Sequence, residues 1–487
     1  MSAAPSNDRL QRRPDAALRL QFSLRSSAIS PQERRAFEAS LAALRLPKAR
    51  VGSPYDARIE LGATLRQSAP AVQNAEFALV RDAGFAEIGL TVRFDDGALL
   101  LVGTPTRETP NAPIELEIRV DETLFASASL PWGVQPDLWS LWKNLPSPAG
   151  PYPVEDQARQ AVSVPQTDKI VVAACRRGRS HEHRGQFRED AFAVKIGPPG
   201  GWNFFAVADG AGSAKFSRQG AKIACETVVA QLARHFELSY RRGEIPSPLF
   251  SGRRRTVRSD AAPTYALYDG TEAPPALVAV FHRALYETFM RVVAERDARN
   301  QTLPPGERPA QLRDFYSTLL CCAVRKYRSG WAILSYWVGD GAFAIYGPGC
   351  DSSQVVPLGE PDGGEFAGQT RFFTSKSEIA LEPIQRRFRA AVLRDFDALV
   401  MATDGVADPY FEVAADQRSP QKWRNFWNLR GSGDLFDGVF EREIAPDERA
   451  RRLLEGLRFK VPDNHDDRAL LLLLNPDRFA DARAPRR

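Results

Sequence analysis

The sequence is poor in the residues that build disulfide frameworks and thiolate metal sites. Its 487 residues include five cysteines and five histidines, and no two cysteines form a Cys-x-x-Cys pair. An odd number of scattered thiols argues against a disulfide framework and against a thiolate zinc site. We therefore expect the reduced thiols that are typical of cytosolic proteins.

Long hydrophobic runs are also missing. No stretch reaches the roughly 18 consecutive apolar residues that suggest a membrane-spanning helix, and even Leu470 to Leu474 is only as long as a strand. The first residues, Met1 to Arg19, are polar and hold several charges, so no secretory signal is visible. The prediction is a cytoplasmic protein with no membrane partner.

Charge of a single sign is not in excess. The 65 Lys and Arg against 60 Asp and Glu leave a formal net charge of +5, which gives no reason to expect a nucleic-acid partner. Charged residues make up 26% and hydrophobic residues 43%, the balance of ordinary soluble domains. The length suffices for two or three domains, each with its own core.

The first third of the chain predicts one helix followed by short strands. Ser30 suits an N-cap and Pro31 suits the first position of a helix that runs to about Leu46. From about residue 58 to 130, apolar and polar residues alternate with a period of two, and Asp96-Gly97 predicts a tight turn. The predicted divisions are a tail and helix (1–50), a small all-β sandwich (51–131) and a Pro-rich linker (132–168).

Two segments of the predicted sandwich carry a resemblance of their own. Leu101 to Thr106, together with the strand pattern of Glu115 to Val120, resembles the closing half of the immunoglobulin-like (Ig-like) modules of many bacterial multidomain proteins. Such modules bind a protein or a glycan, or they serve as spacers and packing domains. We favour the role of a spacer or packing domain for residues 51–131.

The segment 169–476 alternates core strands with two long amphipathic helices, and a basic tail (477–487) follows. Ser217 is the expected N-cap of the first long helix. Trp331 to Val338 and Ala342 to Tyr346 are expected to form a hairpin around Gly339-Asp340-Gly341. Asp397 to Thr403 reads as a strand buried on both faces.

Three apolar runs of this segment end in an aspartate that is followed by glycine. The aspartates are Asp209, Asp340 and Asp404, and we predict that the fold brings them together. Glu189-Asp190 and Asp466-Asp467 stand beside two further core strands. Carboxylates without nearby histidine or thiolate form a hard oxygen site for Mg²⁺ or Mn²⁺. They cannot all stay ionised unless cations neutralise them, and two bridged metals would activate a water and bind a phosphoryl oxygen.

The order of these motifs resembles the metal-dependent type 2C (PPM) serine/threonine protein phosphatases. The similarity runs from about Lys169 to Leu474 and implies an α+β fold, a central antiparallel β-sandwich with helices on both sides (α-β-β-α). The motifs that carry it are Arg188-Glu189-Asp190-Ala191-Phe192, Val207-Ala208-Asp209-Gly210-Ala211-Gly212-Ser213, Ser317-Thr318-Leu319, Val338-Gly339-Asp340-Gly341, Ala402-Thr403-Asp404-Gly405-Val406-Ala407-Asp408 and Asp466-Asp467 before a hydrophobic strand.

The resemblance implies roles for the carboxylates in binding two metals. Asp209 would bridge both ions, and Gly210 would offer its carbonyl. Asp404 and Asp466 would complete the first metal, and Glu189-Asp190 would hold waters of the second. Asp209, Asp404 and Asp466 are thus the implied catalytic carboxylates.

A third, weaker metal is also implied, together with two departures from the family pattern. Asp340 and Asp408, with Asp404, match the positions that hold it in bacterial members. Some members place a histidine directly after the Asp-Gly pair as a proposed general acid, and this chain has Ala211 there.

The second departure concerns the phosphate-holding arginine of the family. It usually stands five residues before the aspartate that matches Asp190, and this chain has Gly185 there. Arg184 and Arg188 are the candidate substitutes. We favour Arg184, since Gly185 lets the chain fold back towards the metals. Arg253 to Arg255 is the next candidate.

The prediction is a cytoplasmic, Mg²⁺- or Mn²⁺-dependent phosphoprotein phosphatase. Its implied partner is a phosphorylated protein, such as a Ser/Thr kinase or the target of one, in a signalling role. The alternative hypothesis is a catalytically weak scaffold that keeps the phosphatase fold to hold a partner. The missing arginine and histidine favour the scaffold slightly, and the full carboxylate set disfavours it.

Overall fold

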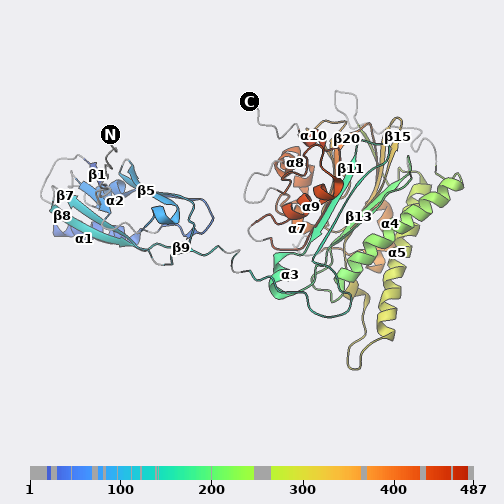
Figure 1. Cartoon of the computed structure of the whole chain (residues 1–487), viewed down its shortest axis with the longest axis horizontal. Coiled ribbons are helices and arrows are strands. Elements are labelled where there is room, and N and C mark those ends of the chain that lie inside the picture. The colour runs from blue at the N-terminus through green and yellow to red at the C-terminus, as the bar shows by residue number, and fades with distance from the viewer. Residues whose placement is uncertain are drawn as a thin grey trace, which may run out of the picture. The chain divides into compact units, whose positions relative to one another are not determined.

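The computed structural model describes residues 19–22, 30–44, 46–68, 75–79, 84–95, 97–110, 112–120, 123–137, 140, 142–198, 200–245, 265–362, 370–427, 435–461 and 464–480. The chain divides into two compact units, Met1–Trp142 and Lys143–Arg487 (Figure 1). No helix within these residues combines the length and the apolarity that a membrane crossing requires.

The first unit packs short helices and strands around one core. Helix α1 (Pro31–Ala43) starts at the N-cap Ser30, whose hydroxyl accepts a hydrogen bond from the Glu33 backbone amide, which confirms the predicted cap. One sheet has the order β1 (Arg19–Phe22), β4 (Ala75–Leu79), β7 (Ile114–Val120), β8 (Thr123–Leu130). The other described elements are β3 (Tyr55–Ile59), β6 (Ala98–Gly103) and β5 (Leu90–Asp95) in a second sheet, the parallel pair β2 (Ala49–Arg50) and β9 (Val134–Gln135), α2 (Leu61–Ser68) and the 3-10 helix η1 (Ala86–Ile88).

Helix α2 was not predicted. The alternation of Ile59 and Leu61 suggested a continuing strand, but the chain turns into a helix at Leu61 and buries Leu61 and Leu65 on one side. Ile59 is the last residue of β3 and Leu61 is the first residue of the helix, so the period-two pair crosses the boundary between the two elements, whereas Leu61 and Leu65, four positions apart, follow the helical period. The unit is therefore not all-β, and its Ig-like identity and the domain limits stay predictions.

Besides its helices, the second unit contains two six-stranded sheets. The first has the order β10 (Gln157–Ser163), β11 (Ile170–Arg176), β21 (Arg468–Leu474), β20 (Phe396–Ala402), β17 (Ala342–Pro348), β18 (Val355–Pro357). The second has the order β12 (Ala191–Lys195), β13 (Asn203–Ala208), β15 (Leu319–Tyr327), β16 (Gly330–Val338), β19 (Phe388–Leu393), β14 (Tyr265–Asp269). Every pairing in both sheets is antiparallel.

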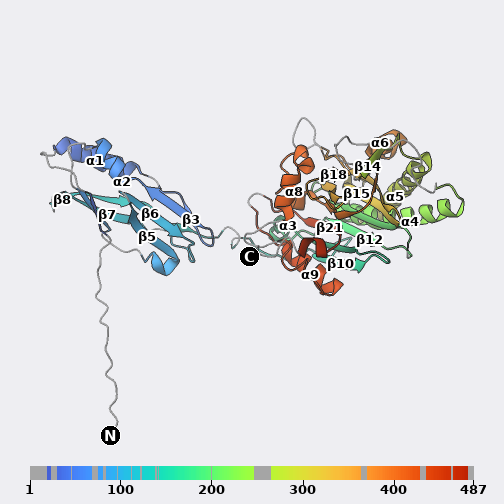
Figure 2. The same cartoon turned by 90° about the horizontal axis from the view of Figure 1, so that it is seen from above.

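Helices cover the outer faces of this sandwich, as Figure 2 shows from above. The long helices α4 (Ser217–Arg241) and α5 (Pro275–Gln301) pack on the second sheet, and α7 (Asp404–Ala407), α8 (Pro420–Trp427) and α9 (Pro446–Gly456) pack on the first. The remaining described elements are α3 (Arg179–Arg184), η3 (Leu312–Phe315), η4 (Lys376–Ile379), α6 (Leu381–Arg387), η5 (Ala414–Arg418) and α10 (Asp477–Ala480). The predicted α-β-β-α arrangement is confirmed.

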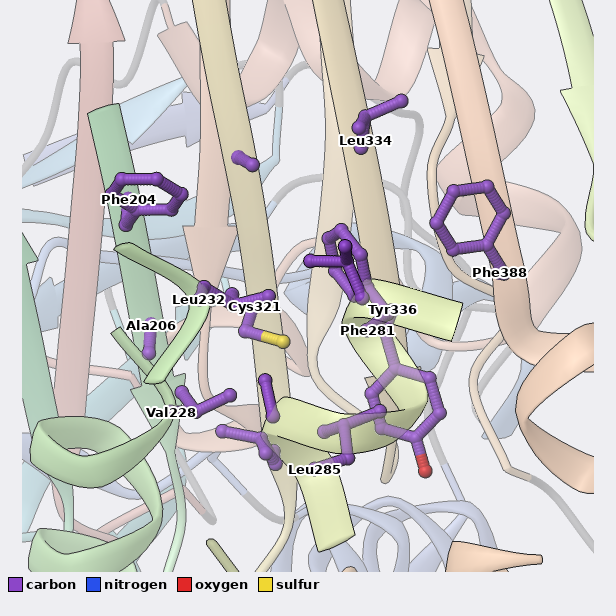
Figure 3. Close-up of a cluster of buried hydrophobic side chains, with 14 of the residues drawn as sticks. Phe204, Ala206, Val228, Leu232, Phe281, Leu285, Cys321, Leu334, Tyr336 and Phe388 are labelled. Carbon is purple, nitrogen blue, oxygen red and sulfur yellow. The ribbon is translucent and has the colours of Figure 1, made fainter. Parts of the chain in front are cut away.

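The alternation of side chains on the strands explains the layers. In Figure 3, Phe204 and Ala206 of β13 point to the same cluster as Val228 and Leu232 of α4. The intervening residue Phe205 faces the opposite sheet instead. Because strand side chains alternate between faces, each all-apolar strand serves two cores, which is why these runs lack polar residues.

Two local predictions were wrong. Ser217 is the first residue of α4 and the N-cap position is Phe216, so Ser217 caps nothing. The segments around Gly339-Asp340-Gly341 are not a hairpin either: β16 lies in one sheet and pairs with β15 and β19, whereas β17 lies in the other and pairs with β18 and β20. The three residues carry the chain from one sheet to the other.

Candidate metal centre

The three strand-end aspartates meet at one end of the sandwich. Asp209 follows β13, Asp340 follows β16 and Asp404 follows β20. One carboxylate oxygen from each lies within 4.8 Å of the other two, a spacing that could hold a metal ion. The first two aspartates come from one sheet and the third from the other, so the cluster spans the seam between the sheets.

The backbone of Asp209 is fixed from both sides. Its amide donates to Thr318 Oγ1 at 2.8 Å, and its carbonyl accepts from the Thr318 amide at 2.8 Å. The next residue, Gly210, lies so close to the Glu189 carbonyl that a Cβ would stand 2.8 Å from that oxygen. Glycine is therefore required there, and Ser317-Thr318, whose motif the sequence singled out, has a structural role.

Asp190 reaches the same cluster from the start of β12. Its side chain is buried and accepts a hydrogen bond from Thr403 Oγ1 at 2.7 Å, and Thr403 in turn accepts from the Ala469 amide at 2.9 Å. Thr403 directly precedes Asp404. The threonine thus ties the aspartate of one sheet to two strands of the other.

Asp467 organises the segment in front of Asp190. Its carboxylate accepts hydrogen bonds from the backbone amides of Gly178 and Glu189, each at 2.5 Å, and lies 3.0 Å from His181 Nδ1. The other ring nitrogen of His181 lies 4.0 Å from Glu189 Oε2. Burial lowers the pKa of His181, but Asp467, Glu189 and Asp466 raise it more, to about 9. The imidazolium is therefore part of the charge balance of the site.

Burial and mutual repulsion raise the pKa values of the carboxylates. The pKa of Asp190 rises to about 8 because of burial and the charge of Asp467. Burial, together with Asp404 and Asp190, raises the pKa of Asp209 well above its ordinary value. The pKa of Asp404 also rises well above its usual value, through burial, Asp466 and Asp340. Like charges at this spacing disfavour the ionised form.

The donor set fits divalent cations that prefer oxygen. The three side chains of the central cluster are carboxylates, the ligand type of Mg²⁺ and Mn²⁺. Asp190 Oδ1 is buried and, among the described residues, has no hydrogen-bond partner. A buried oxygen without a donor is costly, and a bound cation would remove the cost. The sequence-derived expectation of a cation site is thus physically consistent with this geometry.

Three predicted ligands lie around the central cluster. Glu189 is half-buried, and burial chiefly raises its pKa to about 7. Asp408 and Asp466 are exposed at the rim. Although Asp408 is exposed as a whole residue, burial of its carboxyl group raises the pKa of Asp408 to about 6, together with the negative charges of Asp340 and Asp466. Thr370 Oγ1 donates to Asp340 Oδ2 at 2.6 Å, so Asp340 is held in place from outside the cluster.

The two arginine candidates differ in accessibility. Arg188 is buried, and its guanidinium donates to the Glu155 carbonyl at 2.9 Å, to Cys175 Sγ at 3.0 Å and to the Asp190 carbonyl. Arg184 is exposed as the last residue of helix α3, and Gly185, which the sequence analysis expected to turn the chain, follows it as the C-cap with a φ of 65°. Arg253 to Arg255 lie outside the described residues.

Sequence reasoning missed the residues that position the ligands. Asp467 stood in the Asp466-Asp467 motif without a role of its own. His181, like His183, could be interpreted from the sequence only as a general acid or as a loop histidine without a role, and Thr370 carried no signal because its segment is irregular. Thr403 stood in a recognised motif, and its hydroxyl next to a strand-end aspartate was the available signal.

We predict that Thr403→Val lowers the free energy of unfolding by about 1–3 kcal/mol, since it leaves the Asp190 carboxylate and the Ala469 amide without their buried partner. Thr374→Val is the matched control, because Thr374 is fully buried and its hydroxyl has no hydrogen-bond partner among the described residues. Denaturant unfolding measures both variants. Equal effects would mean that the Thr403 bonds contribute nothing.

A two-sheet antiparallel sandwich between helical layers, with acidic residues gathered at the strand ends, defines the α-β-β-α class of protein phosphatases. The model of the family described as Protein phosphatase 2C matches residues 177–434, more than half of the chain. The chain belongs to this family, and the resemblance inferred from its motifs is confirmed.

Solved structures of similar fold include a bacterial serine phosphatase, at 12% identity and a TM-score of 0.34, over 62% of this chain and 96% of that one. The serine/threonine phosphatase Stp1 from Staphylococcus aureus is similar at 10% identity and a TM-score of 0.34, and the match covers 64% of this chain and 97% of that one. The serine-threonine phosphatase 2C from Toxoplasma gondii is similar at 13% identity and a TM-score of 0.34, and the match covers 66% of this chain and 99% of that one. TM-scores this low support no inference, so the family match alone assigns the chain. No curated protein matches it in sequence.

Proposed function

We propose that this chain is a metal-dependent protein serine/threonine phosphatase that hydrolyses phosphoserine and phosphothreonine by attack of water, without a covalent phosphoenzyme. The observation that supports this most is the convergence of Asp209, Asp340 and Asp404 to within 4.8 Å at the seam of a phosphatase 2C fold. A structural protein gains nothing from carboxylates that repel one another there.

The proposed cation ligands are those that the sequence suggested. Two divalent cations, when bound, would lower the pKa of water and neutralise charge on the phosphoryl group. We assign their binding to Asp209 and the carbonyl of Gly210 at the centre, with Glu189, Asp190, Asp404 and Asp466 around them. Asp340 and Asp408 are proposed for a third cation with Asp404, and the contact of Asp340 with the central cluster suits that role.

The chain's own residues orient this site. Thr318 holds the Asp209 backbone, and Thr403 fixes the Asp190 carboxylate. His181 and Asp467 hold the Glu189 segment against the cluster. Ligands that are already held in place before the reaction need little rearrangement, which lowers the free energy of reaching the transition state.

A phosphorylated protein in the cytoplasm, such as a Ser/Thr kinase or its target, is the proposed substrate. The scaffold alternative rests on Ala211 and Gly185, where a general acid and a phosphate arginine are missing. Mn²⁺-dependent hydrolysis of p-nitrophenyl phosphate and of a phosphopeptide panel decides between them. A scaffold would bind phosphopeptides without releasing phosphate.

Arg184 and Arg188 are expected to fail in different ways when changed to alanine. Arg188→Ala removes a buried guanidinium from three acceptors and should lower the free energy of unfolding by roughly 3 kcal/mol or more. Arg184→Ala, at an exposed position, should leave stability unchanged and raise KM for a phosphopeptide about tenfold if it holds the phosphate.

Denaturant unfolding and steady-state kinetics at saturating Mn²⁺ separate the two effects. A wild-type KM for Arg184→Ala would show that other residues hold the phosphate.

A further inference from the structure

A pocket rich in arginine lies beside the metal centre. Its volume is about 200 Å³, and five arginines and two carboxylates line it. One of the carboxylates is Asp466, a proposed cation ligand, so the pocket and the centre are neighbours. We call it the arginine pocket. Four of its five arginines are Arg176, Arg179, Arg458 and Arg468.

The strand register forces two of these cations together. Arg176 ends β11 and Arg468 begins β21, and the two residues are direct partners in the antiparallel pairing. Directly opposite residues point to the same face of a sheet, and like charges in that position are destabilising. Arg458 adds a third positive charge from just beyond the end of α9. Burial, and then the charge of Arg458, lower the pKa of Arg176 to about 10, although Glu182 and Asp156 act in the opposite direction.

Carboxylates offset this charge only in part, since Glu182 and Asp466 line the pocket beside five arginines. In the part of the chain that the structure describes, no ion pair joins Arg176, Arg458 or Arg468 to an acidic side chain. The guanidinium of Arg468 donates instead to the carbonyls of Leu457 at 2.7 Å and Phe459 at 2.6 Å. Arg468 is nine-tenths buried, and its Nε has no hydrogen-bond partner among the described residues.

The fifth arginine has a different role. Arg177 is buried and donates to Asn144, Leu145, Ser147 and Gln186, so its donors are spent on the protein itself. It forms part of the wall. Arg468 is engaged in the same way, because its terminal nitrogens donate to the carbonyls of Leu457, Phe459 and Asn464. The groups left for a ligand are the guanidiniums of Arg176 and Arg458.

We propose that the arginine pocket is an oxyanion subsite that binds a second phosphate group of the same protein substrate. A phosphate carries about two negative charges and several acceptor oxygens, which suits clustered guanidiniums better than one carboxylate does. The position beside Asp466 places the bound group next to the phosphate that is hydrolysed. This proposal rests on the proposed function, and it assigns substrates phosphorylated at two nearby residues as the preferred class.

The first arm of the test uses inorganic phosphate and needs no activity. The full chain is melted in a chelator, with phosphate or with chloride at equal ionic strength. Phosphate should raise the Tm of the wild type and of Arg328→Ala, a control at an exposed turn at the far end of β15. The rise should be lost in Arg176→Gln and in Arg458→Ala. Arg458 is exposed, so its variant keeps the fold.

The second arm compares a doubly and a singly phosphorylated peptide of one sequence. For the wild type and Arg328→Ala, kcat/KM should be at least about tenfold higher for the doubly phosphorylated peptide. The ratio should approach one in the two pocket variants, and a ratio cancels any loss common to both peptides.

Each outcome has a distinct meaning. An unchanged Tm in the wild type overturns the subsite even if the protein is an active phosphatase. A phosphate-dependent Tm without peptide preference overturns the substrate-borne source and leaves a free-phosphate site. Absence of any hydrolysis refutes the proposed function, while the melting arm still decides whether the pocket binds phosphate.

Discussion

Asp209→Asn is expected to lower kcat at least roughly 100-fold, more than the loss of a partner outside the ligand set costs. The Asp209 carboxylate is one of the three whose oxygens lie within 4.8 Å of one another, and burial, Asp404 and Asp190 raise its pKa well above the ordinary value. An amide at this position keeps the shape but cannot supply the negative charge that a bridging ligand needs.

The fold should survive this change. Removing one of several mutually repelling charges reduces the electrostatic repulsion in the metal-free protein, so its free energy of unfolding should stay equal or rise. Asp297→Asn, at an exposed position on α5, is the control for a lost carboxylate. Initial rates with a phosphopeptide and circular dichroism of both variants check the expectation. Turnover above a few per cent of wild type for Asp209→Asn would contradict the two-metal assignment.

Divalent cations are expected to raise the melting temperature by several degrees. They bind the folded cluster and not the open chain, and a concentration of 100 times the Kd is worth about 2.7 kcal/mol. The effect should grow with pH. Folding raises the carboxyl pKa values to about 6 in Asp408, about 7 in Glu189 and about 8 in Asp190.

The sign follows from linkage. A group whose pKa is higher in the folded state favours folding at low pH, and that contribution is lost as pH rises from about 4, the unfolded value, through the folded value. The metal-free protein should therefore lose stability between about pH 4 and pH 8. Millimolar Mn²⁺ should remove much of that loss. Melting curves in chelator and in Mn²⁺ over this range test it, and curves that coincide would support the scaffold hypothesis.

The sequence predicts the second unit better than the first because long apolar runs leave little choice. A strand with no polar residue must be buried on both faces, and an aspartate at its end must lie where the core stops. Asp209, Asp340 and Asp404 could be grouped on that basis. The helix α1 was predictable for a different reason, because Ser30 and Pro31 are local signals that need no tertiary context.

What the sequence could not show depends on contacts between distant segments. Asp-Gly is a common hairpin signal, so Gly339-Asp340-Gly341 looked like a turn. Gly339 has a φ of 123° and packs against Thr318, and this geometry sends the chain across to the other sheet. The roles of Asp467 and His181 rest on bonds that span nearly 300 positions, which no local pattern contains.

The seam position of the centre has a consequence for ion selectivity. Asp209 and Asp340 belong to one sheet and Asp404 to the other, so the gap between their oxygens depends on the thickness of the layer between the sheets. Phe205, Met401 and Leu471 fill that layer. An ion of the wrong radius would have to pry the sheets apart or draw them together against close-packed side chains. If the proposed cation binds there, its radius would be selected in part by hydrophobic residues that do not contact it.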